Sequence, residues 1–163
     1  MYDCILLWKS REFYFQNDAV IAKTSMTHIE LLPNQVLNMM TQLQGVSIIF
    51  KQTRGLHNAA ISDGNDFFEH RQDIDRHNAL DKLYGYCIQR HIPVRDKALI
   101  FSERISSEIL IKAAKIGVGV TLSESAPTSL AVKLAQDLNI TAIGFIRNGK
   151  FNIYSHPERI KNL

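Results

Sequence analysis

The second half of the chain alternates short apolar runs with amphipathic segments, and this order restricts the fold more than any other feature. The pattern predicts buried strands at 98–101, 118–122 and 141–146, separated by helices at 105–115 and 128–138. Strands that alternate with helices in this way are typical of parallel strands joined by right-handed crossovers, with the helices covering the sheet. The sequence therefore predicts an α/β domain.

The first half predicts elements that extend this sheet. An amphipathic helix is expected at 33–44, with a proline in its first turn. Two strand-like runs flank an Asp-Gly-Asn sequence at 63–65, which is a strong hairpin signal. Asp75 is expected to cap a long helix over 76–90. A turn at 147–150 predicts an antiparallel edge strand after it, so the sheet is expected to be mixed.

Length and composition set further bounds. With 163 residues, 45% of them hydrophobic, we expect one domain over 1–163, with an irregular lead-in at 1–32 and an α/β core at 33–163. A net charge of +3 gives no indication of a nucleic-acid partner. No apolar run approaches the roughly 20 residues that cross a bilayer, and the start does not resemble a signal peptide. Two cysteines, Cys4 and Cys87, are too few for a disulfide framework or a zinc site, so we expect a cytoplasmic protein without a structural metal.

Polar clusters follow two of the predicted strands. Ser102 and Arg104 come after the first, and Ser123, Ser125 and Thr128 come after the second. In α/β sheets, hydroxyl groups, guanidinium groups and helix N-terminal amides at strand ends hold phosphate-bearing ligands. One interpretation is an anion pocket. The other is that the hydroxyl groups only cap the helices that follow.

The stretch 73–82 carries six ionisable side chains in ten residues. His77 lies within it, and His57 begins another polar cluster. A lone histidine is more often a core residue than a catalyst, so both assignments stay open. Asp81 follows His77 by four residues and would share a helix face with it. Such a pair would orient the imidazole or simply stabilise the end of the helix.

Four motifs in this chain occur in the order and spacing of one protein family. They are His57-Asn-Ala-Ala, Asp75-Arg-His-Asn-Ala-Leu-Asp-Lys82, Arg104-Ile-Ser-Ser-Glu108 and Ser125-Ala-Pro-Thr-Ser-Leu-Ala131. Together they resemble the FdhD family, the sulfur-carrier accessory proteins of formate dehydrogenases, over about two-thirds of the chain. The resemblance implies a three-layer α/β/α domain with a mixed, cytidine-deaminase-like sheet.

The resemblance also implies a function. Family members bind the molybdenum cofactor in its bis-molybdopterin guanine dinucleotide form. A cysteine desulfurase charges a cysteine with persulfide sulfur, which is passed to the cofactor before it enters formate dehydrogenase. The resemblance implies Cys4 as the carrier, because it lies at about the distance before His57 at which the family has its cysteine loop; Cys87 falls in the apolar stripe of its helix. The implied cofactor-binding residues are His57, Arg76, His77, Asn78, Ser102, Arg104, Ser125, Thr128, Phe145, Ile146, Arg147, Asn148, Gly149 and Lys150.

The chain departs from the family pattern in four loops. Cys4 is all that remains of a Cys-Gly-x-Cys-Gly loop, and glycines of three other loops are replaced by Arg54, Asp75 and Glu103. Two functions therefore stay open: a sulfur carrier that uses Cys4, and a non-catalytic chaperone module that holds the cofactor or a nucleotide. A hydrolase that uses the two histidines ranks last. An exposed sheet edge would favour a homodimer.

Overall fold

The protein is built around a six-stranded mixed sheet, and a computed structural model describes its residues 27–46 and 55–163. The strands are β1 (His57–Ser62), β2 (Phe67–Asp73), β3 (Ala98–Phe101), β4 (Val120–Ser123), β5 (Thr141–Arg147) and β6 (Lys150–Ile153). The helices are α2 (Pro33–Val46), α4 (Arg76–Gln89), α5 (Ser107–Ile116), α6 (Ser129–Asp137) and the short 3₁₀ helix η1 (Pro157–Arg159). The expectations for Cys4 and Arg54 lie outside the described residues.

The strand order is β2-β1-β3-β4-β5-β6. The central strands β3, β4 and β5 are parallel, with Val120 paired to both Ala98 and Thr141. The other pairings between these six strands are antiparallel. Helices α5 and α6 connect the parallel strands, as the alternation in the sequence predicts. The mixed sheet is therefore confirmed, with hairpins added at both of its edges.

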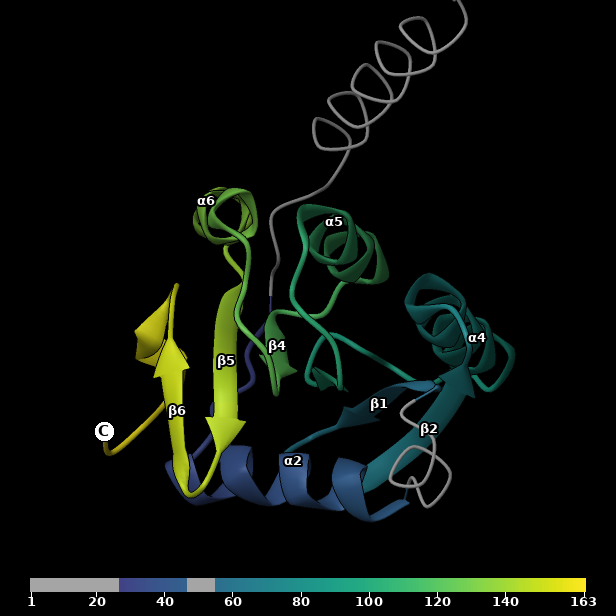
Figure 1. The fold of residues 1–163 in the computed structure, drawn as a ribbon, viewed down its shortest axis with the longest axis horizontal. Coiled ribbons are helices and arrows are strands. Elements are labelled where there is room, and N and C mark those ends of the chain that lie inside the picture. Colours follow the sequence, from purple (N-terminus) through teal and green to yellow (C-terminus); the bar gives the residue numbers. More distant parts are fainter. Residues whose placement is uncertain (1–26, 47–54) are drawn as a thin grey trace, which may run out of the picture.

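Helices cover both faces of the sheet. Figure 1 shows α4, α5 and α6 on one side and α2 alone on the other. Side chains of β3 alternate between the two cores: Leu99 and Phe101 pack in the core under α4, α5 and α6, whereas Ala98 and Ile100 pack in the core under α2. Because both faces are covered, β3 and β4 are buried along their whole length. The predicted three-layer α/β/α arrangement is confirmed.

Local signals in the sequence explain where several elements begin and end. The Asp75 carboxylate caps α4 by accepting hydrogen bonds from the amides of His77 and Asn78, at 2.7 and 3.2 Å. In the hairpin between β1 and β2, the Asp63 carboxylate accepts the amide of Asn65 at 2.9 Å. Both features agree with the predictions from the sequence.

The start of α5 differs from the prediction. We expected a helix from 105 that opens directly after Arg104, but α5 begins at Ser107, and the Ser106 hydroxyl accepts the amide of Ile109. Several residues with cap-forming side chains occur in succession here, and local propensity does not choose among them. The consequence for function is that Ser102 and Arg104 lie in a loop at the end of β3 instead of in the first turn of a helix.

Two further findings concern the ends of the fold. Leu31 pairs with Ile160 in a parallel bridge, which joins the segment before α2 to the C-terminal segment. Across 27–46 and 55–163, we find no helix that is long and apolar enough to cross a membrane.

Candidate functional site

A cleft of about 570 Å³ lies where β3, β4 and β5 end. The carboxyl ends of parallel strands meet at one edge of a sheet, which is the usual ligand-binding edge in α/β proteins. The structure brings five residues implied by the family resemblance together here: Ser102, Arg104, Ser125, Phe145 and Arg147. The remaining lining comes from Glu103, Glu124 and Ala126. We call this space the strand-end cleft.

A second cleft of about 370 Å³ adjoins the first, and we call it the α2 cleft. Glu124 and Arg147 line both clefts, so the two spaces meet at these side chains. Ile146, Asn148 and Gly149 line the α2 cleft from the end of β5 and the turn that follows. Helix α2 supplies the opposite wall with Leu37, Met40, Thr41 and Gln44. The combined space falls in the size range of small-molecule sites, about 300–1,000 Å³.

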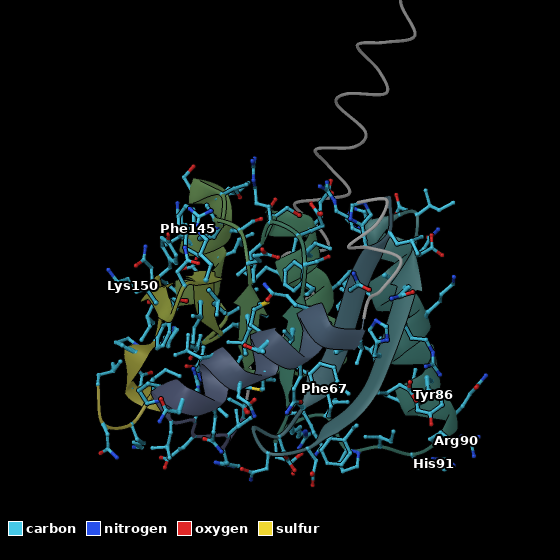
Figure 2. The ribbon with its side chains drawn as sticks, turned by 60° about the horizontal axis from the view of Figure 1, so that its bottom comes forward. Phe67, Tyr86, Arg90, His91, Phe145 and Lys150 are labelled. Carbon is cyan, nitrogen blue, oxygen red and sulfur yellow. The ribbon has the colours of Figure 1, made fainter. Side chains whose placement is uncertain are left out.

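The end of β5 is irregular, and this irregularity shapes the strand-end cleft. Phe145 has a φ of 54°, a left-handed conformation that is rare for a bulky residue. The register between β5 and β6 shifts between Gly144 and Arg147, where Arg147 pairs with the exposed Lys150. The Arg147 guanidinium lies 5.2 Å from the centre of the Phe145 ring, a cation–π contact. Figure 2 shows Phe145 and Lys150 at the same end of the sheet.

The loop after β4 is held from two sides. The Ser123 hydroxyl donates a hydrogen bond to the Glu103 carbonyl and accepts one from the Ser125 amide, the latter at 2.9 Å. The Ser125 carbonyl in turn accepts the amide of Phe145 at 3.3 Å. These contacts join the ends of β3, β4 and β5. They fix the backbone on either side of Glu124, which lines both clefts.

Gly144 permits the close approach of this loop to β5. A Cβ atom at position 144 would lie 2.7 Å from the Ser125 carbonyl oxygen and 3.1 Å from Cδ of Pro127. We therefore expect Gly144→Ala to lower the free energy of unfolding by about 1–3 kcal/mol, measured by urea denaturation. Gly85→Ala is the matched control, because a Cβ atom there meets nothing within 4 Å and alanine favours the helix. Equal stabilities of the two variants would refute the steric argument.

Hydroxyl groups implied in ligand binding already have structural partners. Thr128 caps α6, since its hydroxyl accepts the amide of Ala131 at 3.2 Å. The Ser102 hydroxyl accepts the amide of Asn58 at 3.1 Å, which ties the end of β3 to the start of β1. The capping interpretation therefore describes Thr128, whereas Ser102 stabilises the sheet while it lines the strand-end cleft.

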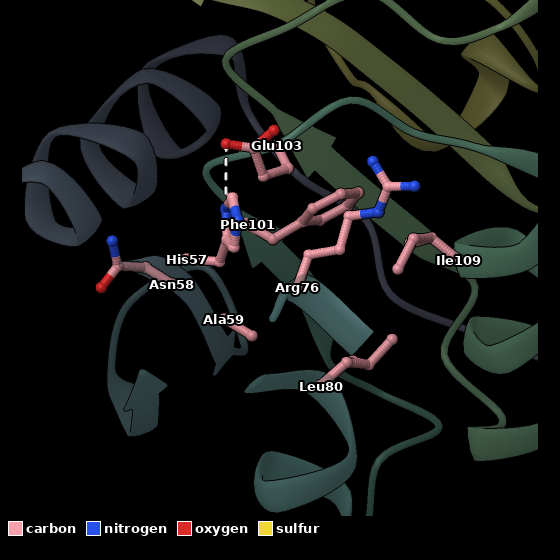
Figure 3. Close-up of a pocket in the computed structure, with 8 residues that line it drawn as sticks. All are labelled: His57, Asn58, Ala59, Arg76, Leu80, Phe101, Glu103 and Ile109. Atoms are coloured by element: carbon pink, nitrogen blue, oxygen red, sulfur yellow. Dashed lines mark ion pairs between the residues drawn. The ribbon is translucent and has the colours of Figure 1, made fainter. Parts of the chain in front are cut away.

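His57 and Glu103 lie in contact beside the strand-end cleft. The Nδ1 atom of His57 lies 3.1 Å from Oε1 of Glu103, and Figure 3 marks this contact. Nδ1 is buried and makes no aligned hydrogen bond, so the attraction depends on a protonated imidazole. The two residues share a small pocket with Arg76 and Phe101. Its volume of about 10 Å³ leaves room for roughly one water molecule, so this pocket is not itself a ligand site.

Most charges of the stretch 73–82 pair with nearby groups. Lys82 lies 2.5 Å from the Asp73 carboxylate. Asp81 pairs with Lys112 of α5 at 2.7 Å, and His77 lies 3.3 Å from Glu108 of the same helix. The expected contact between His77 and Asp81 is therefore replaced by two contacts from α4 to α5. His77 and Asn78 stabilise the start of α4 and are not among the residues that line the two clefts.

Asp73 gives a prediction about acid stability. The Asp75 amide, which donates to Asp73 at 2.8 Å, and the Lys82 ammonium lower the pKa of Asp73 to about 2. Because the folded pKa lies below the unfolded value of about 3.9, this contribution is present above pH 4 and is lost as the pH falls towards 2. We expect Asp73→Asn to reduce the loss of stability over this window, measured by urea denaturation at several pH values. Parallel pH profiles for the two proteins would contradict this assignment.

Sequence reasoning missed two parts of the site. Glu124 lies between Ser123 and Ser125, just after the strand predicted at 118–122, so the strand-end rule applied to those two serines also selects it. The α2 wall has no comparable signal. The helix was predicted from its apolar periodicity, but its position beside the end of β5 depends on tertiary packing.

Comparison with known proteins identifies the family. The FdhD/NarQ family matches residues 4–161, which is nearly the whole chain. The chain belongs to the FdhD/NarQ family. It is 79% identical over 153 residues to the sulfur carrier protein FdhD of Staphylococcus haemolyticus, covering 94% of this chain and 58% of that protein. It is 80% identical over 152 residues to the sulfur carrier protein FdhD of Staphylococcus aureus strain Newman, covering 93% of this chain and 57% of that protein.

The FdhD-family chain thus spans somewhat more than half the length of these relatives. Its fold also matches a crystal structure of a putative formate dehydrogenase accessory protein from Desulfotalea psychrophila. The TM-score is 0.79 at 24% sequence identity, and the match covers 88% of this chain and 61% of that one. At this level of identity, the likeness supports the fold.

Proposed function

We propose that this chain is a sulfur carrier that binds the molybdenum cofactor through its guanine dinucleotide part in the strand-end cleft and the α2 cleft. The observation that carries the proposal is the convergence of Arg104, Arg147 and Phe145 at one strand-end cleft. Guanidinium groups form charge-assisted hydrogen bonds to phosphates, and an aromatic ring offers a stacking face to a base. In this function the cofactor is the substrate that receives sulfur.

A protonated His57 would give the strand-end cleft an excess of positive charge, which favours a phosphate-bearing ligand. Two arginines and two glutamates line the strand-end cleft, so the simple sum of charges is balanced. The Glu103 carboxylate, however, lies against His57, which neutralises it when the imidazole is protonated. Arg104 and Arg147 then outweigh the single carboxylate of Glu124. The adjoining α2 cleft gives an elongated ligand room beyond the phosphate groups.

We propose Cys4 as the residue that carries the sulfur. The family match over residues 4–161 and the relatives named sulfur carrier proteins support this proposal. Cys87, the one cysteine in the described part of the chain, is 3% exposed and lies in the core. We propose that a cysteine desulfurase supplies the sulfur and that formate dehydrogenase receives the sulfurated cofactor, in the cytoplasm. A persulfide on Cys4 is the form in which this chain would hold the sulfur.

Calorimetric titration of the purified protein with GDP tests the cofactor site, because GDP represents the guanine nucleotide end of the cofactor. We expect saturable binding with one site per chain. GMP provides the matched ligand control, since it lacks one phosphate and is expected to bind more weakly. The absence of GDP binding would refute the proposed use of the clefts.

A further inference from the structure

We propose that Glu124 selects guanine over adenine by accepting hydrogen bonds from the edge of the base. This inference rests on the proposed function, and it adds a residue that determines specificity. Glu124 is half-buried at the junction of the strand-end cleft and the α2 cleft. A ligand that extends from one space into the other must pass this carboxylate.

The backbone of the loop that carries Glu124 is held in place by its neighbours. Its neighbours are held by the hydrogen bonds from the Ser125 amide to the Ser123 hydroxyl, at 2.9 Å, and from the Phe145 amide to the Ser125 carbonyl, at 3.3 Å. A backbone that is already ordered lowers the conformational entropy that the loop loses when a ligand binds. The loop therefore presents Glu124 to a ligand in either cleft.

Glu124 also differs from the other carboxylate of the strand-end cleft. Glu103 has its partner in His57, at 3.1 Å. Within the described ranges, no ion pair involves Glu124. Arg104 and Arg147 can only donate hydrogen bonds, so the charged acceptors that line the strand-end cleft are Glu103 and Glu124. Of these two, Glu124 is the one without an ion pair among the described residues.

The chemistry of the purine edges decides which base such an acceptor prefers. Guanine presents two adjacent donors, N1–H and the 2-amino group, which match the two oxygens of a carboxylate. Adenine presents an acceptor at N1 and one donor at its 6-amino group. A carboxylate therefore makes at most one hydrogen bond to adenine, and its second oxygen is repelled by the lone pair of N1. Paired hydrogen bonds of this kind change affinity by roughly tenfold or more between bases.

The test compares GDP, IDP and ADP by calorimetric titration of the wild-type protein and of Glu124→Gln. The wild type is expected to bind GDP at least about tenfold more tightly than ADP, with IDP between them because inosine lacks the 2-amino group. In Glu124→Gln, the ratio of GDP affinity to ADP affinity is expected to fall about tenfold, because the amide places a donor against a donor of guanine.

Glu103→Gln is the matched control. It removes the other carboxylate of the cleft, so it is expected to change the affinities for GDP and ADP by the same factor. An unchanged GDP-to-ADP ratio in Glu124→Gln, or equal binding of GDP and ADP by the wild type, would overturn the role of Glu124 and leave the proposed cofactor site standing. Failure of the wild type to bind either nucleotide would overturn both.

Discussion

Replacing Cys4 with alanine is expected to abolish sulfur transfer and to leave GDP binding unchanged. In the proposed reaction, the Cys4 thiolate attacks the outer sulfur of the desulfurase persulfide, the sulfur–sulfur bond breaks, and the desulfurase cysteine leaves as a thiolate. Alanine has no nucleophile, so no persulfide forms. The measurement is the mass of the intact protein after incubation with a cysteine desulfurase and cysteine, which shows one added sulfur atom on the wild type.

Cys87→Ala is the control for this experiment. Cys87 is a residue of α4 that is 3% exposed, its side chain packs in the core, and burial raises the pKa of its thiol. A thiol that is both inaccessible and protonated does not accept sulfur. We therefore expect Cys87→Ala to be charged like the wild type. Persulfide on Cys4→Ala would disprove the assignment of the carrier. A wild type that binds GDP but takes up no sulfur would instead support the non-catalytic chaperone module.

The sequence predicted the framework of the fold because each element carried its own local signal. Apolar runs separated by amphipathic segments gave the parallel strands and their helices, and the Asp-Gly-Asn turn and the Asp75 cap gave the hairpin and the start of α4. The start of α5 was placed too early because the serines around it have similar capping propensity. Ser106 is the residue that caps α5, because its hydroxyl accepts the amide of Ile109. That contact depends on the path of the chain between β3 and α5.

The site was less predictable than the fold, because it depends on contacts between distant segments. The dense charge at 73–82 suggested a binding loop, but most of these groups pair within β2 and α4 or with α5. The cleft instead depends on the left-handed conformation of Phe145 and on the loop that packs against Gly144. Neither feature has a signature in a single sequence, since a bulky residue with positive φ is held by its surroundings.

Arg147→Ala is expected to weaken GDP binding by roughly tenfold to a hundredfold, the range for loss of a charge-assisted hydrogen bond. Arg147 lines both clefts, so its guanidinium is within reach of a nucleotide that binds in either one. Its removal also takes away the cation–π contact with the Phe145 ring, which lies 5.2 Å from the guanidinium. The measurement is calorimetric titration with GDP, with thermal unfolding to verify that the variant folds.

Arg90→Ala is the control for Arg147→Ala, because it also removes one positive charge but lies away from the two clefts. Arg90 is exposed and lies 5.7 Å from the centre of the Tyr86 ring, so it also stacks on an aromatic side chain. Figure 2 shows it at the opposite end of the molecule from Phe145. Because charges at that distance are screened at physiological salt, Arg90→Ala is expected to bind GDP like the wild type. An equal loss of GDP affinity in both variants would mean that net charge alone attracts the nucleotide. If Arg147→Ala kept the wild-type affinity, Arg147 would not be the residue that contacts the phosphates.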